Sequence, residues 1–293
     1  MINWPESLVI ELAARRCVIF IGAGASVGAK RKKVREDVEE SPPNWSNLLK
    51  ILSTGRNSGT QADLEKSLEL IEEGRLLESA EILRSSCLQT AEYNRLITGI
   101  FSRYSATDIH KFVEVLDQKV VVTTNFDTLY EDHCKQGQAR DAYTVVKYYD
   151  AGLITRMRSP QRVIVKAHGC ISQPEHTILT KSDFFRARAE NQGFFKALES
   201  IFLTHTLLFI GYSISDPDIQ LLLENGSITS PSDHPHYAVM KEGMHHAIKA
   251  SFLRTNNVEI IEFDPNNDFA DLLEGLAELC GRVNELRADQ PLL

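Results

Sequence analysis

Short runs of apolar residues alternate along the chain with longer segments in which apolar and polar residues recur at helical spacing. The short runs are rich in Val, Ile and Phe without alternation, which is typical of strands covered on both faces of a parallel sheet. Such strands are predicted at 17–22, 119–125, 163–168, 206–211, 236–240 and 258–263. Helical patterns lie near 127–136, 182–204, 243–255 and 267–287. This alternation predicts an α/β fold, a Rossmann-like doubly wound parallel sheet.

The stretch from 30 to 106 interrupts this alternation. It begins with a charged segment at 30–40, which is interpreted as a solvated loop. Four helical patterns follow, near 46–54, 61–73, 75–88 and 91–103. We therefore expect an all-helical insertion at 30–106 within a Rossmann-like domain made of residues 1–29 and 107–293. Two roles for the insertion stay open, a lid over the ligand crevice or a surface for assembly.

Charge and composition exclude several classes of protein. The 293 residues include 32 Lys and Arg against 40 Asp and Glu, a net charge of −8, so direct nucleic-acid binding through a basic surface is not expected. No run of 18 apolar residues or signal-peptide pattern is present, which argues against a membrane location. The five cysteines are scattered without a Cys-x-x-Cys pair, so neither a zinc site nor a redox dithiol is predicted. The expected compartment is the cytoplasm.

Four of the predicted strands end in residues that do not resemble core positions. These ends are 22–28, 123–127, 168–169 and 211–216. In an open parallel sheet, ligands bind beyond the carboxyl ends of the strands. The four segments are therefore expected to meet at one crevice.

The first of these ends is a glycine loop. Gly22, Gly24 and Ser26 allow a tight turn whose backbone N–H groups could hold a pyrophosphate. The glycine spacing is one residue longer than in the dinucleotide fingerprint, and the loop lacks the lysine of a nucleoside-triphosphate P-loop. An ordinary strand-to-helix turn is the alternative interpretation.

Asn125, Asp127 and His168 are the other candidates for chemistry. Asp127 is in position to cap the following helix, but that role leaves Asn125 unexplained. His168 follows a strand, and the imidazole of histidine is the side chain suited to act as an acid or base near neutral pH, which makes His168 a candidate for that role. No carboxylate or cysteine stands at metal-ligand spacing from His168, so no metal site is predicted.

Taken in order, these motifs resemble those of the sirtuin superfamily. The matching pattern is Gly-Ala-Gly-x-Ser from Gly22, Thr-x-Asn-x-Asp from Thr123, His-Gly at His168 and Gly-x-Ser from Gly211. The segments 178–184 and 211–218 are similar to the bacterial sirtuin-like branch of anti-phage defence proteins rather than to the deacetylases. The resemblance spans about residues 17 to 220.

The resemblance implies NAD as the substrate and a role for each motif. Asn125 would hold the nicotinamide ribose and an attacking water, and His168 would be the base acting on the ribose hydroxyl or on water. The other implied NAD-binding residues are Gly22, Ala23, Gly24 and Ser26 at the phosphates, Asp127 at the nicotinamide carboxamide, Thr124 as a further contact, and Gly211, Ser213 and Asp216 on the adenosine side.

The departures from the deacetylases shape the functional prediction. The zinc-binding cysteine pairs and the peptide-clamping segment of deacetylases are missing, which leaves water as the acceptor. We therefore predict an NAD glycohydrolase that forms nicotinamide and ADP-ribose without zinc, as the effector of an anti-phage NAD-depletion system. The alternatives are a non-catalytic sensor of NAD or ADP-ribose and, as a third choice, a protein deacylase. The expected partners are further copies of the chain and a ring-shaped ATPase of the DNA-translocase type.

Overall fold

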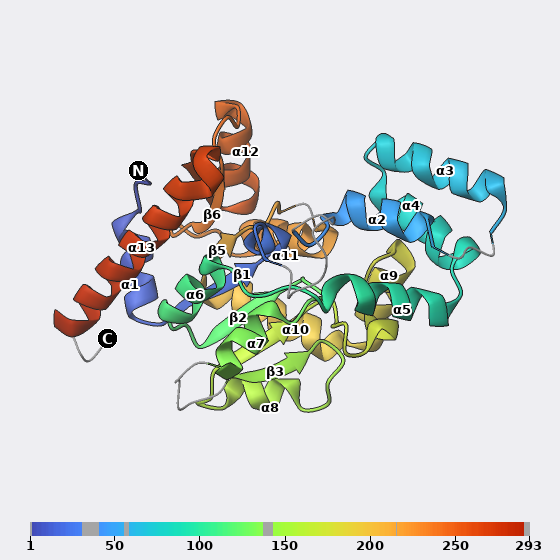
Figure 1. Cartoon of the computed structure of the whole chain (residues 1–293). Helices are drawn as coiled ribbons and strands as arrows, with labels where there is room; N and C mark the ends of the chain where they lie inside the picture. The colour runs from blue at the N-terminus through green and yellow to red at the C-terminus, as the bar shows by residue number, and fades with distance from the viewer. Residues whose placement is uncertain (1, 31–40, 56–58, 137–142, 215, 290–293) are drawn as a thin grey trace.

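A parallel sheet forms the centre of the molecule (Figure 1). The computed structural model describes residues 2–30, 41–55, 59–136, 143–214 and 216–289. Within these residues seven strands pair in the order β3-β4-β2-β1-β5-β6-β7, and every neighbouring pair is parallel. The strands are β1 Cys17–Ile21, β2 Val120–Thr123, β3 Thr144–Lys147, β4 Val163–Lys166, β5 Thr206–Ile210, β6 His236–Lys241 and β7 Val258–Phe263. The predicted doubly wound α/β sheet is confirmed.

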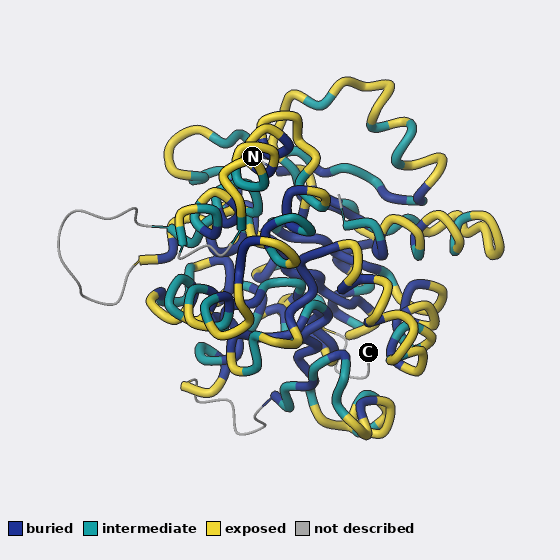
Figure 2. Tube along the Cα trace, turned by 90° about the vertical axis from the view of Figure 1, so that its right-hand side faces the viewer, coloured by how far each residue is buried: buried dark blue, intermediate teal, exposed yellow. Residues whose placement is uncertain are grey.

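Helices cover both faces of the sheet, which explains why the strands are apolar throughout. Ile19 and Ile21 of β1 belong to the core under α1 (Glu6–Ala13), α6 (Asp108–Val115), α7 (Leu129–Gln136) and α13 (Asn266–Asp289). Val18 and Phe20 point into the opposite core, under α8 (Leu153–Arg158), α9 (Lys181–Glu190), α10 (Gln192–Thr204), α11 (Pro217–Thr229) and α12 (His246–Asn256). Figure 2 shows the buried residues concentrated at the centre of the molecule and the exposed residues at its periphery.

Several elements differ from the sequence-based prediction. Strand β3 and helices α1, α6, α8 and α11 were not predicted, and the single helix expected at 182–204 is two helices that meet at Asn191. Strand β3 has four residues at the edge of the sheet, of which one is fully buried, so its apolar signal is weak. Helix α11 begins with Pro217 directly after its cap, Asp216, a start signal that falls within the segment interpreted as a ligand-binding turn.

The region predicted as a helical insertion contains α2 (Trp45–Ser53), α3 (Gln61–Glu72), α4 (Leu76–Ile82), a π-helical turn η2 (Leu83–Cys87) and α5 (Thr90–Phe101). Leu49, Leu52 and Ile97 are at the centre of its own hydrophobic cluster. In Figure 1, α2–α4 lie at the opposite end of the molecule from α1 and α13. Most of the charged segment predicted to be a loop, residues 31–40, lies outside the described residues.

Helix α13 ends the described chain and packs mainly against α1 and α6. The indole Nε1 of Trp4 donates a 2.8 Å hydrogen bond to the carbonyl of Gly275, which ties the first residues of the chain to this helix. Leu272, Leu276 and Leu279 form its buried apolar face. None of the helices that the structure describes is long and apolar enough to cross a membrane.

Candidate active site

The four strands that carry the sirtuin-like motifs are direct neighbours in the sheet. Their order is β4-β2-β1-β5, and all four run in the same direction. Their carboxyl ends therefore lie side by side, as the sequence predicted. Since the chain moves from one side of β1 to the other between β4 and β5, the boundary between β1 and β5 is the topological switch point, where open α/β sheets bind ligands.

The glycine loop after β1 packs closely against the turn after β5. Gly22 N donates to Ile210 O at 3.1 Å, and Gly24 N donates to Gly211 O at 2.8 Å. A Cβ atom on Gly211 would lie 2.1 Å from the backbone nitrogen of Ala25. These glycines are therefore required for the close approach of two backbones. Because the N–H groups of Gly22 and Gly24 are bonded within the protein, the phosphate-binding role of these two residues stays a prediction.

Residues 23–26 of this loop form a short 3₁₀ turn. Ala23 is exposed at its start, whereas Ser26 is buried. The Ser26 hydroxyl donates to the Asp127 carboxylate at 3.4 Å. The hydroxyl predicted to contact a phosphate thus reaches the turn that follows β2.

Asn125 and Asp127 lie on that turn and are held differently. The Asn125 amide nitrogen donates to Gly22 O at 3.1 Å, so this half-buried side chain lies across the ends of β2 and β1. Asp127 is buried, and its Oδ1 accepts from Leu129 N at 3.0 Å, which is the helix cap considered from the sequence. Thr124, also predicted to contact NAD, is half-buried and lies near the Tyr212 hydroxyl.

A buried lysine beneath this turn was not found from the sequence. Lys166 is the last residue of β4 and is fully buried. Its ammonium donates to the Asp127 carbonyl oxygen and pairs with Glu131 Oε1 at 3.0 Å. Burial raises the pKa of both the Asp127 and the Glu131 carboxyl groups, although the Lys166 charge opposes the shift. The sequence feature that could have revealed Lys166 is a charged residue within an otherwise apolar strand.

His168 lies two residues after Lys166 in the loop that leaves β4. Its ring packs edge to face on Phe184 of α9, with ring centres 5.2 Å apart. Its Nε2 is 2.8 Å from Asp216 Oδ2, and only 12% of the His168 side chain and 8% of the Asp216 side chain are exposed. Burial favours the neutral form of Asp216, but the His168 charge and hydrogen bonds outweigh burial and lower the pKa of Asp216.

The turn after β5 contains the remaining predicted residues. Gly211 has a left-handed backbone with φ of 63°, Tyr212 is buried, and Ser213 is exposed. Sequence reasoning put Gly211, Ser213 and Asp216 together at the adenosine. The structure brings Asp216 to His168, a relationship that the spacing along the chain does not reveal.

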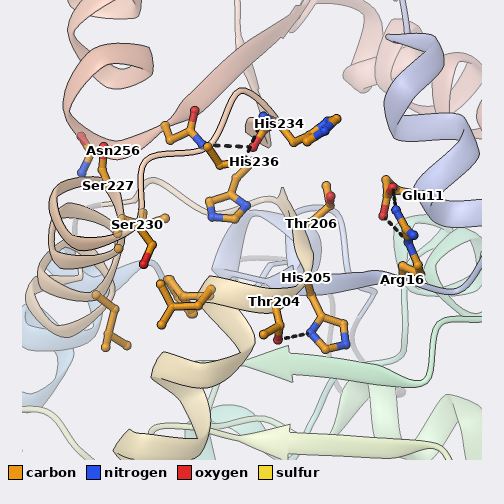
Figure 3. A pocket seen from close by; sticks show the side chains of 17 residues that line it. Glu11, Arg16, Thr204, His205, Thr206, Ser227, Ser230, His234, His236 and Asn256 are labelled. Atoms are coloured by element: carbon orange, nitrogen blue, oxygen red, sulfur yellow. Dashed lines mark hydrogen bonds and ion pairs between the residues drawn. The ribbon is translucent and has the colours of Figure 1, made fainter.

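A separate cavity lies at the opposite, amino-terminal edge of the sheet (Figure 3). Its volume is about 340 Å³, and residues at the starts of β5 and β6 contribute to its lining. Arg16 and Glu11 at its rim pair with each other. Burial lowers the pKa of His236 to about 4, so this lining imidazole is neutral at physiological pH. The cavity contains none of the candidate residues.

The family comparison matches the second half of this arrangement. Residues 119–261, which include β2, β4, β5 and the loops with Asn125 and His168, match the SIR2-like domain family. The match covers just under half of the chain. The sirtuin resemblance inferred from the motif order is thereby confirmed.

Similar proteins include two named "NAD(+) hydrolase ThsA". The one from Bacillus cereus (strain MSX-D12) is 25% identical over 235 residues, which is 79% of this chain and 44% of that protein. The one from Acinetobacter baumannii (strain 532279) is 24% identical over 290 residues, 93% of this chain and 55% of that protein. "Defense-associated sirtuin 2" of Bacillus subtilis is 27% identical over 118 residues, which are 39% of this chain and 11% of that protein. The chain spans about half the length of the two hydrolases.

Proposed function

We propose that this chain hydrolyses NAD to nicotinamide and ADP-ribose at the carboxyl edge of β4, β2, β1 and β5. The observation that carries the proposal is the position of Asn125 and His168 at the ends of the neighbouring strands β2 and β4, beside the switch point at β1. Relatives named as NAD(+) hydrolases support the same substrate. The Asn125 amide can hold the ribose and a water molecule at this edge, and the His168 imidazole can accept a proton.

The reaction breaks the bond between C1′ of the ribose and the pyridinium nitrogen. The electron pair of that bond goes to nicotinamide, which leaves as a neutral molecule and needs no acid. The electron-poor C1′ then takes the oxygen of water, and a proton of that water goes to a base. The enzyme must therefore hold the ribose, position the water and accept one proton.

Each task has a proposed residue. Asn125 would hold the nicotinamide ribose and the water, since its side chain is anchored by the Gly22 carbonyl at the sheet edge. His168 would accept the proton, directly or through a ribose hydroxyl. Asp127 and Thr124 would contact the nicotinamide end, while the exposed Ala23, together with Ser26, would contact the phosphates. Gly211 and Ser213 would face the adenosine side.

Nicotinamide release from NAD by the purified chain tests this proposal. We expect turnover by the wild type and a loss of about 100- to 10,000-fold in Asn125→Ala and in His168→Ala. An exposed histidine variant, His234→Ala, is the control and should retain wild-type activity. Binding of NAD without nicotinamide release in the wild type would support the sensor alternative. Loss of the acetyl group from an acetylated peptide in the presence of NAD would support the deacylase alternative.

The helical insertion is proposed to act as a lid. Its hydrophobic cluster includes Phe126 from the turn after β2 and Cys170, Ile171 and Leu179 from the loops after β4. The Tyr93 hydroxyl of α5 also makes a 2.6 Å hydrogen bond with the Thr177 hydroxyl, and both residues are buried. The insertion is thus built onto the loops that carry Asn125 and His168, which supports the lid role over the assembly role.

Assembly and biological context complete the proposal. The activity would serve anti-phage defence in the cytoplasm by depleting NAD, a role suggested by the relative named as a defence-associated sirtuin. A homo-oligomer and a ring-shaped ATPase partner stay predictions. Light scattering tests the first, and a monomer that is fully active alone would argue that neither assembly nor a partner is needed for the activity.

A further inference from the structure

His168 and Asp216 come from loops that start far apart on the sheet edge. Their strands, β4 and β5, are separated by β2 and β1, a distance of three strand spacings or ~14 Å. The two side chains nevertheless meet at 2.8 Å and are nearly buried. Their contact therefore passes over the carboxyl ends of β2 and β1, where NAD is proposed to bind.

The Asp216 carboxylate is held rigidly before it meets His168. Its Oδ1 accepts from Asp218 N at 2.9 Å and from Ile219 N at 3.1 Å, which makes it the N-cap of α11. Its other oxygen, Oδ2, is the one that faces His168 Nε2. Oδ1 thus already accepts two hydrogen bonds, so a contact with an adenosine ribose would have to use the remaining acceptor site of Oδ2, beside His168.

The remaining groups around the pair keep its geometry fixed. Phe184 packs on the imidazole, and the Asp218 carboxylate behind Asp216 pairs with Arg188 Nε at 3.4 Å. The Tyr212 hydroxyl is buried nearby and is influenced by the charges of both aspartates. His168 thus has a single close anionic partner among the described residues, Asp216, while Asp218 acts on it from a greater distance.

A carboxylate accepts hydrogen bonds and cannot donate them, so the His168 nitrogen that faces Asp216 must carry a hydrogen. With Nε2 protonated, Nδ1 of the neutral ring has the free electron pair that a base needs. We infer that Asp216 is a positioning residue that fixes the Nε2–H tautomer of His168 and leaves Nδ1 to accept the proton. The catalytic consequence rests on the proposed NAD hydrolysis.

The same division of labour is known from serine hydrolases, in which an aspartate holds the histidine in the required tautomer and stabilises its charged form. When His168 accepts the proton, it becomes positive beside the negative Asp216. The buried site then contains an ion pair rather than an unpaired charge, which would be costly there. This role differs from the adenosine contact predicted for Asp216 from its place in the sequence.

The Asp216→Asn variant distinguishes a role in fixing the His168 tautomer from a role in capping α11 alone. Asparagine caps helices as well as aspartate does, so its Oδ1 can still accept from the α11 backbone and the fold should persist. Its amide NH₂ then faces His168 Nε2, which favours the opposite tautomer. We expect kcat to fall about 100-fold or more while the KM for NAD changes less than about threefold.

Two further measurements keep this test decisive. The ¹⁵N shifts of the His168 ring report the tautomer directly and do not require activity, so they test the positioning role even if the proposed hydrolysis fails. Asp183→Asn is the matched control, because Asp183 is also buried at a helix N-terminus and accepts from Thr180 N but does not contact His168. The control should retain wild-type kcat and wild-type His168 shifts.

Support requires a lower kcat together with changed His168 shifts in Asp216→Asn alone. A raised KM for NAD with an unchanged kcat would indicate that Asp216 contacts the adenosine, and it would overturn the inference. Unchanged His168 ring shifts would also overturn it, with or without a loss of activity. If the wild type releases no nicotinamide, the proposed function fails separately, and the ring shifts still decide the tautomer.

Discussion

The rings of Phe126 and Phe101 meet edge to face, with centres 6.0 Å apart and planes at 88°. Phe126 lies between Asn125 and Asp127, whereas Phe101 is the last residue of α5 in the insertion. The carbonyl of Phe126 also accepts from Ile171 N at 2.9 Å, in the loop that follows His168. One residue therefore joins the insertion, the Asn125 turn and the His168 loop.

Phe101→Ala should consequently affect activity as well as stability. Phe101 is 7% exposed, and truncating such a ring costs about 3–5 kcal/mol of unfolding free energy. With Phe126 unsupported, we expect nicotinamide release by the folded fraction to fall about 10-fold or more, since small displacements of positioning groups are costly.

Leu68→Ala is the control within the same insertion. Leu68 is 41% exposed on α3, so its loss should cost about 0.5 kcal/mol or less and leave activity unchanged. Denaturant unfolding and initial rates are measured on both variants. A folded Phe101→Ala protein with wild-type kcat would show that the insertion does not support the Asn125 turn.

The second prediction concerns the contribution of the buried Lys166–Glu131 ion pair to stability. Lys166→Met leaves two buried carboxyl groups, Asp127 and Glu131, without their cation, and breaking a buried pair in this way costs about 3–5 kcal/mol. Adding Glu131→Gln to Lys166→Met should recover part of that loss, although Glu131→Gln alone is destabilising. A double-mutant cycle by urea unfolding measures the coupling, expected at about 1 kcal/mol or more. Additive costs would mean that the ion pair contributes nothing of its own.

The sequence predicted the arrangement of the site better than its contacts. The neighbouring positions of the Gly22, Asn125, His168 and Gly211 segments could be expected, because apolar runs identify the strands and parallel strands share a carboxyl edge. The partner of Asp216 could not, since it depends on how two loops cross two intervening strands. No local pattern encodes that path.

The same limit applies to the elements that were missed. Strand β3 is short and lies at an edge, so it lacks the long apolar run that revealed β1. The partners of Lys166 follow from the packing of β4 on α7, which only the tertiary fold determines. Periodicity therefore located the large buried elements, and the polar contacts between loops required the structure.

Gly211→Ala tests whether the glycines at the switch point are required for backbone packing. The added methyl group would lie 2.1 Å from Ala25 N at a φ of 63°, so both a clash with the glycine loop and left-handed strain arise. We expect a loss of more than about 3 kcal/mol in unfolding free energy, or failure to fold. Gly152→Ala is the matched control, because Gly152 has a φ of 82° with nothing within 4 Å of the added Cβ.

The control variant should therefore lose only the left-handed strain, about 1 kcal/mol. Thermal unfolding of the two variants gives the comparison. Equal losses would mean that the contact between the β1 and β5 loops is loose enough to accept a side chain, contrary to the geometry described above.

The last prediction concerns the pH dependence of stability at Asp218. Burial, reinforced by the charge of Asp216 and opposed by Arg188, raises the pKa of Asp218 to about 6 from an ordinary value of 3.8. Between these values the folded protein holds a proton that the unfolded chain has lost, so this group's contribution to stability falls as the pH rises from about 4 to 6. Asp218→Asn cannot titrate. The free energy of unfolding of Asp218→Asn relative to the wild type should thus rise by about 1–3 kcal/mol over this interval.

Arg188 stays charged throughout, and its attraction for the ionised Asp218 is already included in the pKa of about 6, so it adds no separate pH dependence. The control is Asp63, because hydrogen bonds from Thr60 lower its pKa. Asp63 stabilises the fold above its ordinary pKa of 3.8 and loses that contribution only as the pH falls below that value, so the difference between Asp63→Asn and the wild type should stay nearly constant from pH 4 to 7. Urea unfolding at half-unit intervals from pH 4 to 7 measures both slopes. A flat difference for Asp218→Asn would mean that Asp218 is already ionised at pH 4 in the folded protein, and that solvent or Arg188 compensates for its burial.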